Sequence, residues 1–401
     1  PRLAGGKKLS KAERQQLAMA RLEEQRKNPK AMIEMRDRMV EELADMPGKH
    51  WSTMKLEKMC ERDWRILKED YRIQVKGGGA CHPLRSWTES TLPQELLDAI
   101  EAVGYKEPSP IQRMCIPLGL TNRDMIGIAE TGSGKTAAFV IPMLVYISAK
   151  PPLTEENLSE GPYALILAPT RELANQIHEE TVKFATSFGF KTFAMVGGGG
   201  IASVEHQGFN MRQGVHILVA TPGRLIDCLE RQLLVLNQCN YVVLDEADRM
   251  IDMGFEPQVN TILDAIPAKN MKPDTDEVDD GNDNFEYRQT FMFSATFPTA
   301  VERLSRKYLR RPAMVTIGET GQTAVTVEQR VEWIKKETDK RDRLITLLAK
   351  GPPPPVMVFV AAKKSADVLC KFVVEKGFKA VTLHSGKAQD QREAALEGFK
   401  S

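Results

Sequence analysis

The sequence has no CxxC pair, no excess charge of either sign and no long apolar run. Its six cysteines lie far apart, which argues against a zinc site or a disulfide framework and favours a reducing compartment. Lys and Arg number 55 against 54 Asp and Glu, so net charge neither favours nor excludes nucleic acid. No apolar stretch approaches the length of a membrane span, and the first residues lack the apolar core of a secretory signal. We therefore expect no zinc, no membrane partner and no secretion.

The length of 401 residues predicts two or more domains, and a hydrophobic content of 42% is enough for buried cores. From Trp87 onward, short apolar runs alternate with helical stretches. Strands separated by helices indicate an α/β fold with a parallel sheet covered on both faces. The predicted strands begin near Met125, Ala164, Thr192, His216, Tyr241 and Thr290.

Residues 1–86 predict a charged, helical extension, in which Ser10 and Glu13 form a capping box. The stretch 9–46 is weakly amphipathic, and it fits a solvated helix, a partly disordered segment or a docking arm. The stretch 51–73 carries apolar anchors, so we expect Trp64 and Leu67 to be buried against the first domain or a partner. A loop is predicted over 75–83, and a disordered acidic insertion over 273–284.

A glycine-rich loop at 129–136, "AETGSGKT", lies between a predicted strand and a predicted helix. This is the setting of a phosphate-binding P-loop, in which successive backbone N–H groups and the start of the helix face phosphate oxygens. Lys135 is then placed at the β- and γ-phosphates, and Thr136 offers a hydroxyl to Mg²⁺. The strict pattern has glycine where this chain has Ala129. The predicted cofactor-binding residues here are Ala129, Glu130, Thr131, Gly132, Ser133, Gly134, Lys135 and Thr136.

Three carboxylates follow the apolar run that ends at Leu244. In P-loop enzymes a second strand end supplies an acidic residue to the same Mg²⁺. Asp245 is the first polar residue after the run, so it is the predicted metal ligand together with Thr136. Glu246 is the residue expected to orient or deprotonate the attacking water. The pair predicts hydrolysis of a phosphoanhydride, and leaves Asp248 free to bind elsewhere.

These residues spell DEAD, and the chain from Trp87 to Ser401 resembles the DEAD-box family of ATP-dependent RNA helicases. The resemblance implies RecA-like domains, ATP and Mg²⁺ as cofactors, and RNA as partner. The stretch 104–112 resembles the Q motif, with Trp87 as its upstream aromatic. It implies that Gln112 reads adenine, and an amide can indeed donate to N7 and accept from the N6 amine.

Further strings resemble the family's RNA-backbone and coupling motifs. "SAT" implies that Ser294 and Thr296 couple hydrolysis to strand separation through Asp248, and they join Lys135, Asp245 and Glu246 in the predicted catalytic set. Glycines and helix N-termini suit phosphate contacts. The predicted RNA-binding residues are Pro169, Thr170, Arg171, Gly198, Gly199, Thr221, Gly223, Arg224, Gln389 and Arg392.

The second domain matches the family in part. It offers strand-like runs at 356–362 and 380–386, a helix from Lys364 and a helix from about Gln389, and Phe359 lies centrally in the fourth family motif. The arginine-finger motif is not found between Val325 and Ser401. We therefore expect the chain alone to bind adenine nucleotide with almost no RNA-stimulated hydrolysis.

The predicted domains are a helical extension (1–86), a RecA-like domain (87–317), a linker (318–325) and a partial second RecA-like domain (326–401). The stretches 62–73 and 76–87 and the acidic insertion resemble the spliceosomal branch of the family that acts at the 5′ splice site. This resemblance implies a nuclear RNA helicase in pre-mRNA splicing that works with spliceosomal proteins. An ATP-dependent RNA clamp, and a scaffold with vestigial catalysis, stay open as alternatives.

Overall fold

The fold was analysed in a computed structural model, which describes residues 50–400 apart from 78–80, 198–205, 210, 212, 268–286, 319–326 and 352. The chain divides into two compact units, a first unit (Pro1–Gly321) and a second unit (Gln322–Ser401). The predicted helices of 9–46, the glycines 198–200 and the acidic insertion lie outside the described residues.

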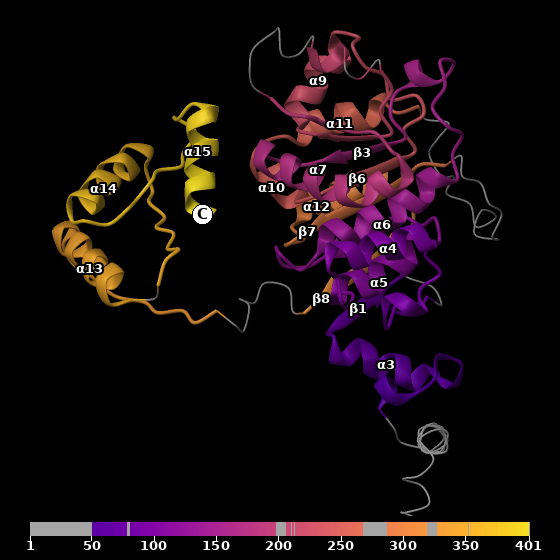
Figure 1. The fold of residues 1–401 in the computed structure, drawn as a ribbon, viewed down its shortest axis with the longest axis horizontal. Helices are drawn as coiled ribbons and strands as arrows, with labels where there is room; N and C mark the ends of the chain where they lie inside the picture. Colours follow the sequence, from indigo (N-terminus) through magenta and orange to yellow (C-terminus); the bar gives the residue numbers. More distant parts are fainter. Residues whose placement is uncertain are drawn as a thin grey trace, which may run out of the picture. The chain divides into compact units, whose positions relative to one another are not determined.

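The described residues of the first unit form an eight-stranded sheet in the order β1-β8-β2-β7-β6-β3-β5-β4 (Figure 1). All six predicted strands are confirmed, and β1 and β8 are additional. The strands are β1 (Ile73–Lys76), β2 (Met125–Ile128), β3 (Ala164–Leu167), β4 (Thr192–Met195), β5 (Ile217–Ala220), β6 (Tyr241–Leu244), β7 (Gln289–Ser294) and β8 (Ala313–Ile317).

The sheet is parallel from β8 to β4, and β1 pairs antiparallel with β8 at the edge. Every residue of β2, β3, β5, β6 and β7 is buried. Short, continuous apolar runs are typical of parallel strands that are covered on both faces. Because all parallel strands end at the same edge, the loops that follow them lie together there.

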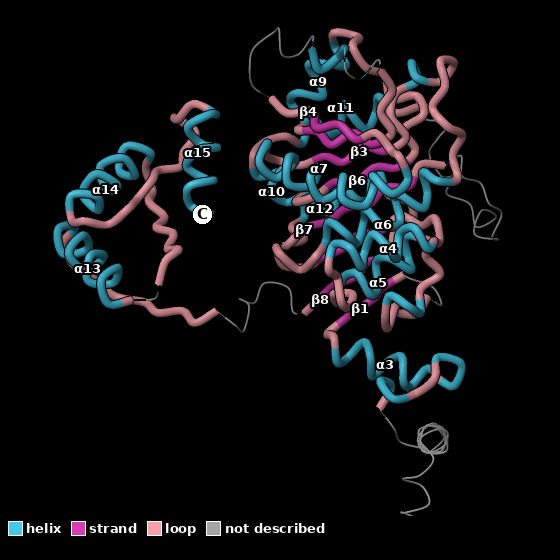
Figure 2. The backbone as a smooth tube through the Cα atoms, viewed as in Figure 1, coloured by secondary structure: helices cyan, strands magenta, loops and turns pink. Residues whose placement is uncertain are grey.

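Helices cover both faces of this sheet (Figure 2). Alternate strand residues face opposite sides: Ile166 and Val243 pack with one set of helices, and Leu165 and Val242 with the other. The first set is α4 (Gln94–Val103), α5 (Pro110–Gly119), α6 (Lys135–Ser148) and α7 (Arg171–Ala185). The second set is α9 (Pro222–Glu230), α10 (Ala247–Asp252), α11 (Glu256–Ala265) and α12 (Thr299–Tyr308).

The end of the N-terminal extension is built into the first unit. It contains the short helices η1 (Trp51–Thr53) and η2 (Leu56–Lys58), then α3 (Glu61–Asp70), and η3 (Trp87–Glu89) follows β1. Trp64 is 7% exposed and Leu67 is fully buried, which confirms the predicted burial. The predicted loop from Val75 was wrong at its start, because Val75 and Lys76 belong to β1, which pairs with β8.

The second unit contains the helices α13 (Glu337–Lys350), α14 (Lys363–Glu375) and α15 (Gln389–Lys400). The helices predicted from Lys364 and Gln389 are confirmed. The predicted strands are not formed: within 327–351 and 353–400 the structure has no strand, and 356–360 is irregular and exposed. A strand needs a hydrogen-bonded neighbour, and the two predicted runs, 356–362 and 380–386, do not pair with each other.

Candidate functional site

The loop between β2 and α6 has the backbone conformation that its glycines allow. Gly132 and Gly134 have φ of 80° and 89°, a region that favours glycine. Gly134 is the N-cap of α6, so the loop leads directly into a helix N-terminus. Lys135 is 7% exposed, and its Nζ donates to the carbonyl of Ala129 at 2.9 Å. The lysine is thus held over the predicted phosphate-binding loop.

Gln112 ties this loop to helix α5. Its Oε1 accepts from the backbone N–H of Ser109 at 2.8 Å, and its Nε2 donates to the carbonyl of Gly134 at 3.0 Å. The amide is 4% exposed. Each end of an amide can make one further hydrogen bond, so one Nε2 hydrogen and one Oε1 lone pair remain for an adenine edge. The motif Ser-x-x-Gln is itself a capping-box signal, so the first contact was readable from the sequence.

Asp245 follows the last residue of β6 and is 3% exposed. Its backbone N–H donates to the carbonyl of Leu167 at 2.9 Å, which fixes the strand end. Burial raises the pKa of Asp245 to about 6, although the positive charge of Lys135 opposes the rise. The raised pKa shows that the ionised form of Asp245 is poorly stabilised by its protein surroundings. A further cation would stabilise that form, which suits Asp245 as the predicted Mg²⁺ ligand.

Glu246 adopts a left-handed backbone conformation, with φ of 50°, at the start of α10. Such a conformation is strained for a residue other than glycine and is common at functional sites. Its carboxylate accepts from Arg249 Nη1 at 3.2 Å. Sequence reasoning did not single out Arg249, whose place one turn later on the helix makes this contact predictable.

Asp248 connects the ends of β6 and β7. Its Oδ2 accepts from the backbone N–H of Thr296 at 3.0 Å and from the Thr296 hydroxyl at 2.7 Å. Its own backbone N–H donates to Ser294 Oγ at 3.4 Å. Burial raises the pKa of Asp248, but the hydrogen bonds from Thr296 and Ser294 outweigh it and lower the pKa overall. The structure therefore joins the two motifs as the sequence predicted.

Trp87, the predicted upstream aromatic, lies in the core on the α4–α7 side of the sheet and is 7% exposed. Its indole Nε1 is buried without a hydrogen-bond partner. The structure thus places Trp87 beneath the surface, and does not show it joining the loop at Gly132 and Gly134.

The predicted RNA-binding residues of the first unit follow β3 and β5. Pro169 and Thr170 come after β3, and Thr170 caps α7 by accepting from the N–H of Leu173 at 3.3 Å. Arg171 lies against Gly197: a Cβ added to Gly197 would lie 3.4 Å from the guanidinium. Gly198 and Gly199 are outside the described residues. Helix N-termini suit backbone phosphates, and the first residues of α7 are half-buried.

After β5, Thr221 is the N-cap of α9, and a Cβ added to Gly223 would meet nothing within 4 Å. Arg224 is 6% exposed, and its Nη1 donates to Gln207 Oε1 at 3.4 Å. Gln207 in turn donates to the carbonyl of Val196 at 3.1 Å. Arg224 is therefore held inward, and Gln207 is a partner that no sequence motif indicated.

In the second unit, Gln389 and Arg392 lie one turn apart on α15, and Arg392 Nη1 donates to Gln389 Oε1 at 3.0 Å. Phe359 is 90% exposed.

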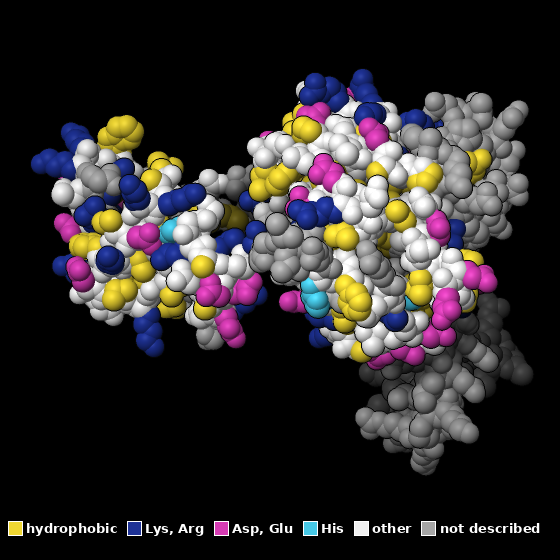
Figure 3. Space-filling view, turned by 90° about the horizontal axis from the view of Figure 1, so that it is seen from above, with side chains coloured by type: hydrophobic (Ala, Val, Ile, Leu, Met, Phe, Trp, Pro, Cys, Tyr) yellow, Lys and Arg dark blue, Asp and Glu magenta, His cyan; other side chains and the backbone are white. Residues whose placement is uncertain are grey.

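Over the face drawn in Figure 3, basic and acidic side chains are interspersed, in line with the balanced composition.

No helix among the described residues combines the length and the apolar character that crossing a membrane would require. In the same part of the chain, no group of three or more His, Cys, Asp or Glu side chains is arranged to hold a metal ion.

Comparison with known proteins gives two family matches. Residues 109–304 match the DEAD/DEAH box helicase model, and residues 339–401 match the helicase conserved C-terminal domain. The pre-mRNA-splicing ATP-dependent RNA helicase prp28 of Sclerotinia sclerotiorum is 54% identical over 381 residues, covering 92% of this chain and 46% of that protein. The chain thus spans about half the length of the curated relatives it matches.

Two solved structures are also similar. The crystal structure of the yeast DEAD-box splicing factor Prp28 aligns with a TM-score of 0.62 and 42% identity, over 88% of this chain and 77% of that chain. The structure of the RNA helicase Prp28 from Chaetomium thermophilum bound to ADP aligns with a TM-score of 0.57 and 51% identity, over 87% and 78%.

Proposed function

Because this chain belongs to the family of DEAD-box helicases, we propose that it is the core of an ATP-dependent RNA helicase that acts in pre-mRNA splicing. The observation that carries the proposal is the set of polar side chains that the structure brings together after three neighbouring strand ends, where Lys135, Asp245 and Asp248 are buried and Asp248 accepts from Thr296. Lys135 follows β2, Asp245 and Asp248 follow β6, and Thr296 follows β7. Such a set fits a phosphoanhydride better than an apolar ligand.

ATP and Mg²⁺ fit the residues that are present. Lys135 and the backbone N–H groups of 131–136 would hold the phosphates, and Thr136 and Asp245 would hold the ion, which usually takes one or two carboxylates beside phosphate oxygens. When bound, Mg²⁺ neutralises charge on the phosphates. The positive φ of Gly132 and Gly134 gives the loop the tight curvature that this role needs.

Glu246 is the residue placed to take a proton from water. Its side chain is largely buried, and the contact with Arg249 fixes one of its oxygens. The other oxygen is left to orient a water. The carboxylate of its neighbour Asp248 already accepts from Thr296 and from the backbone N–H of Arg249, so it does not share this task. We assign Asp248 to the coupling between hydrolysis and the grip on RNA.

RNA is the proposed partner at the ends of β3 and β5. Thr170 and Thr221 begin helices, and Gly223 leaves open space beside one of them. Backbone N–H groups and helix N-termini bind phosphates without reading bases. Choice of RNA would then come from spliceosomal proteins, and the site of action would be the nucleus. The relatives' names, which refer to pre-mRNA splicing, support this part.

An RNA clamp that hydrolyses ATP without unwinding would use the same residues, so it stays the second candidate. A scaffold is disfavoured because Lys135, Asp245, Glu246 and Ser294 are intact and buried together. We also propose that residues 87–317 form the first RecA-like domain and that residues 326–401 form part of the second.

The test is ATP hydrolysis by the full-length protein, with and without single-stranded RNA, beside unwinding of a short duplex. We expect RNA-stimulated phosphate release that Lys135→Ala abolishes. RNA-stimulated hydrolysis without strand separation would favour the clamp. No nucleotide binding at all would contradict both enzymes and favour the scaffold.

A further inference from the structure

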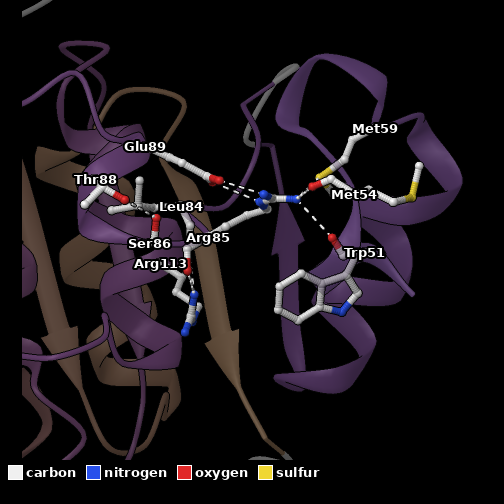
Figure 4. A network of polar contacts seen from close by, with 9 residues as sticks. All are labelled: Trp51, Met54, Met59, Leu84, Arg85, Ser86, Thr88, Glu89 and Arg113. Atoms are coloured by element: carbon white, nitrogen blue, oxygen red, sulfur yellow. Dashed lines mark hydrogen bonds and ion pairs between the residues drawn. The ribbon is translucent and has the colours of Figure 1, made fainter. Parts of the chain in front are cut away.

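The side chain of Arg85 joins the N-terminal segment to the body of the first unit (Figure 4). One side of its guanidinium pairs with the Glu89 carboxylate, through Nε at 2.8 Å and Nη2 at 2.6 Å. The other side, Nη1, donates to the carbonyls of Trp51 at 2.9 Å and Met54 at 2.8 Å. The side chain is 11% exposed. A planar guanidinium can serve both sets of partners at once, which an ammonium cannot.

Arg113, a buried residue of α5, contacts the backbone beside Arg85. Its Nη1 donates to the carbonyl of Leu84 at 3.2 Å and to that of Arg85, while its own carbonyl accepts from the N–H of Leu84 at 2.7 Å. Its guanidinium lies 4.2 Å from the ring centre of Tyr71, and Nη2 donates to Glu107 at 3.1 Å. With a side chain only 2% exposed, Arg113 fixes the stretch around Arg85 against helix α5.

Helix α5 then leads to the nucleotide site. Gln112 precedes Arg113 in this helix, and its amide donates to the carbonyl of Gly134 in the loop before α6. Both side chains are buried. Because closely packed helices move as rigid units, a shift of α5 that displaces Arg113 also displaces Gln112.

We propose that residues 50–76 brace the adenine-reading end of the nucleotide site, with Arg85 as a positioning residue that acts through Arg113 and α5. We refer to these residues as the N-terminal brace. The inference rests on the proposed function, since it requires that Gln112 reads a base. Removal of the Arg85 contacts releases the start of the brace at Trp51 and Met54 and loosens the stretch that Arg113 holds against α5, so base recognition weakens while phosphate binding by the loop at Gly132 and Lys135 persists.

A merely structural role for Arg85 would lower stability and weaken all ligands alike. Base selectivity separates the two roles, because ADP uses both ends of the site, and tripolyphosphate uses only the phosphate loop. The chain offers a matched control in Arg65, which lies on α3 of the same brace and has a side chain that is 71% exposed; within the described part of the chain it pairs with Glu69 alone, at 4.0 Å.

The experiment titrates the chain and its variants with ADP, GDP and tripolyphosphate by calorimetry, beside thermal melting. For Arg85→Ala we expect ADP affinity and the ADP-over-GDP ratio to fall about tenfold, the scale of one well-placed base contact. Tripolyphosphate affinity should stay unchanged. Arg85→Lys keeps the charge but cannot contact both sets of partners, so its ADP-over-GDP ratio should lie between those of Arg85→Ala and the unaltered chain. Arg65→Ala should have the same ratio as the unaltered chain.

An unchanged ADP-over-GDP ratio in Arg85→Ala would overturn the brace while the proposed function stands. Equal losses for all three ligands would also overturn it, as a general destabilisation. If Arg85→Ala does not fold, Arg85→Lys decides by the same ratio. Failure of the unaltered chain to bind ADP would overturn the proposed function, and the brace with it.

Discussion

The edge of the first unit's sheet has two halves that are built differently. Near the ends of β2, β7 and β6, the buried polar side chains have fixed hydrogen-bond partners: Gln112 donates to the Gly134 carbonyl, Lys135 donates to the Ala129 carbonyl, and Asp248 accepts from Thr296. At the ends of β3 and β5, helices begin at Thr170 and Thr221, and Gly223 borders open space.

The difference follows from what each half is proposed to hold. Hydrolysis needs charges fixed in advance and shielded from water, because such charges need no reorganisation during the reaction. Gripping an RNA backbone needs accessible N–H groups and room for a phosphate to approach. Arg224 blurs the division, since it lies in the RNA half but is buried and bonded to Gln207.

The largest expected effect is in the nucleotide half. In the full-length protein, Glu246→Gln should keep ATP binding but slow turnover about a hundredfold or more, because it removes the proposed general base. Single-turnover hydrolysis measures this. Asp245→Ala should instead weaken Mg²⁺-dependent binding. Normal turnover by Glu246→Gln would move water activation to another residue.

The hydrogen bonds of Asp248, which connect the ends of β6 and β7, should contribute to the free energy of unfolding. Asp248→Asn should lower the free energy of unfolding by about 2 kcal/mol at pH 7, the scale of hydrogen bonds to a charged group. The folded pKa of Asp248 is lowered, so its ionised form stabilises the fold at neutral pH. The difference between variant and unaltered chain should shrink as the pH falls below about 4.

Urea unfolding across this pH range makes the measurement, with Asp252→Asn as control, because Asp252 is exposed on the same helix. A difference that persists unchanged in acid would show that the charge of Asp248 is not the source.

Two glycines give the sharpest contrast between the halves. At Gly134 an added Cβ would lie 2.6 Å from Gln112 Nε2, and φ is +89°, so Gly134→Ala should weaken ADP binding about tenfold or more. At Gly223 a Cβ meets nothing, so Gly223→Ala should leave ADP binding unchanged and raise stability by about 0.5–1 kcal/mol. RNA affinity of Gly223→Ala should fall if a phosphate approaches there. Calorimetry measures the ADP affinity of both variants, and thermal melting measures their stability. Equal effects of the two substitutions on ADP binding would contradict the proposed difference between the two halves.

Much of the sheet could be predicted because buried parallel strands are short apolar runs, as at Tyr241–Leu244. The edge pair β1 and β8 could not, since Ile73 pairs with Ile317, and a pairing so distant leaves no local signal. The strands predicted for the second unit failed for a related reason. An apolar run such as 356–360 becomes a strand only beside a hydrogen-bonded neighbour.

The site was predictable where a motif fixes its chemistry, as at Lys135 and Asp245. The link between Asp248 and Thr296 was implied by the resemblance to the DEAD-box family, and the structure shows it as a hydrogen bond. The partners of Gln112 required the structure, although the capping-box pattern contained one of them. Arg85 and Arg113 carry no motif, and a buried arginine that bridges distant segments is visible only once the chain is folded.

The most direct test of the account is the affinity of this chain for ADP against GDP. Gln112 retains one donor and one acceptor after its bonds to Gly134 and Ser109, which suits the adenine edge and mismatches guanine. We predict that ADP binds at least about tenfold more tightly than GDP, and that Gln112→Ala removes the preference. Equal affinity of the unaltered chain for the two nucleotides would contradict the account.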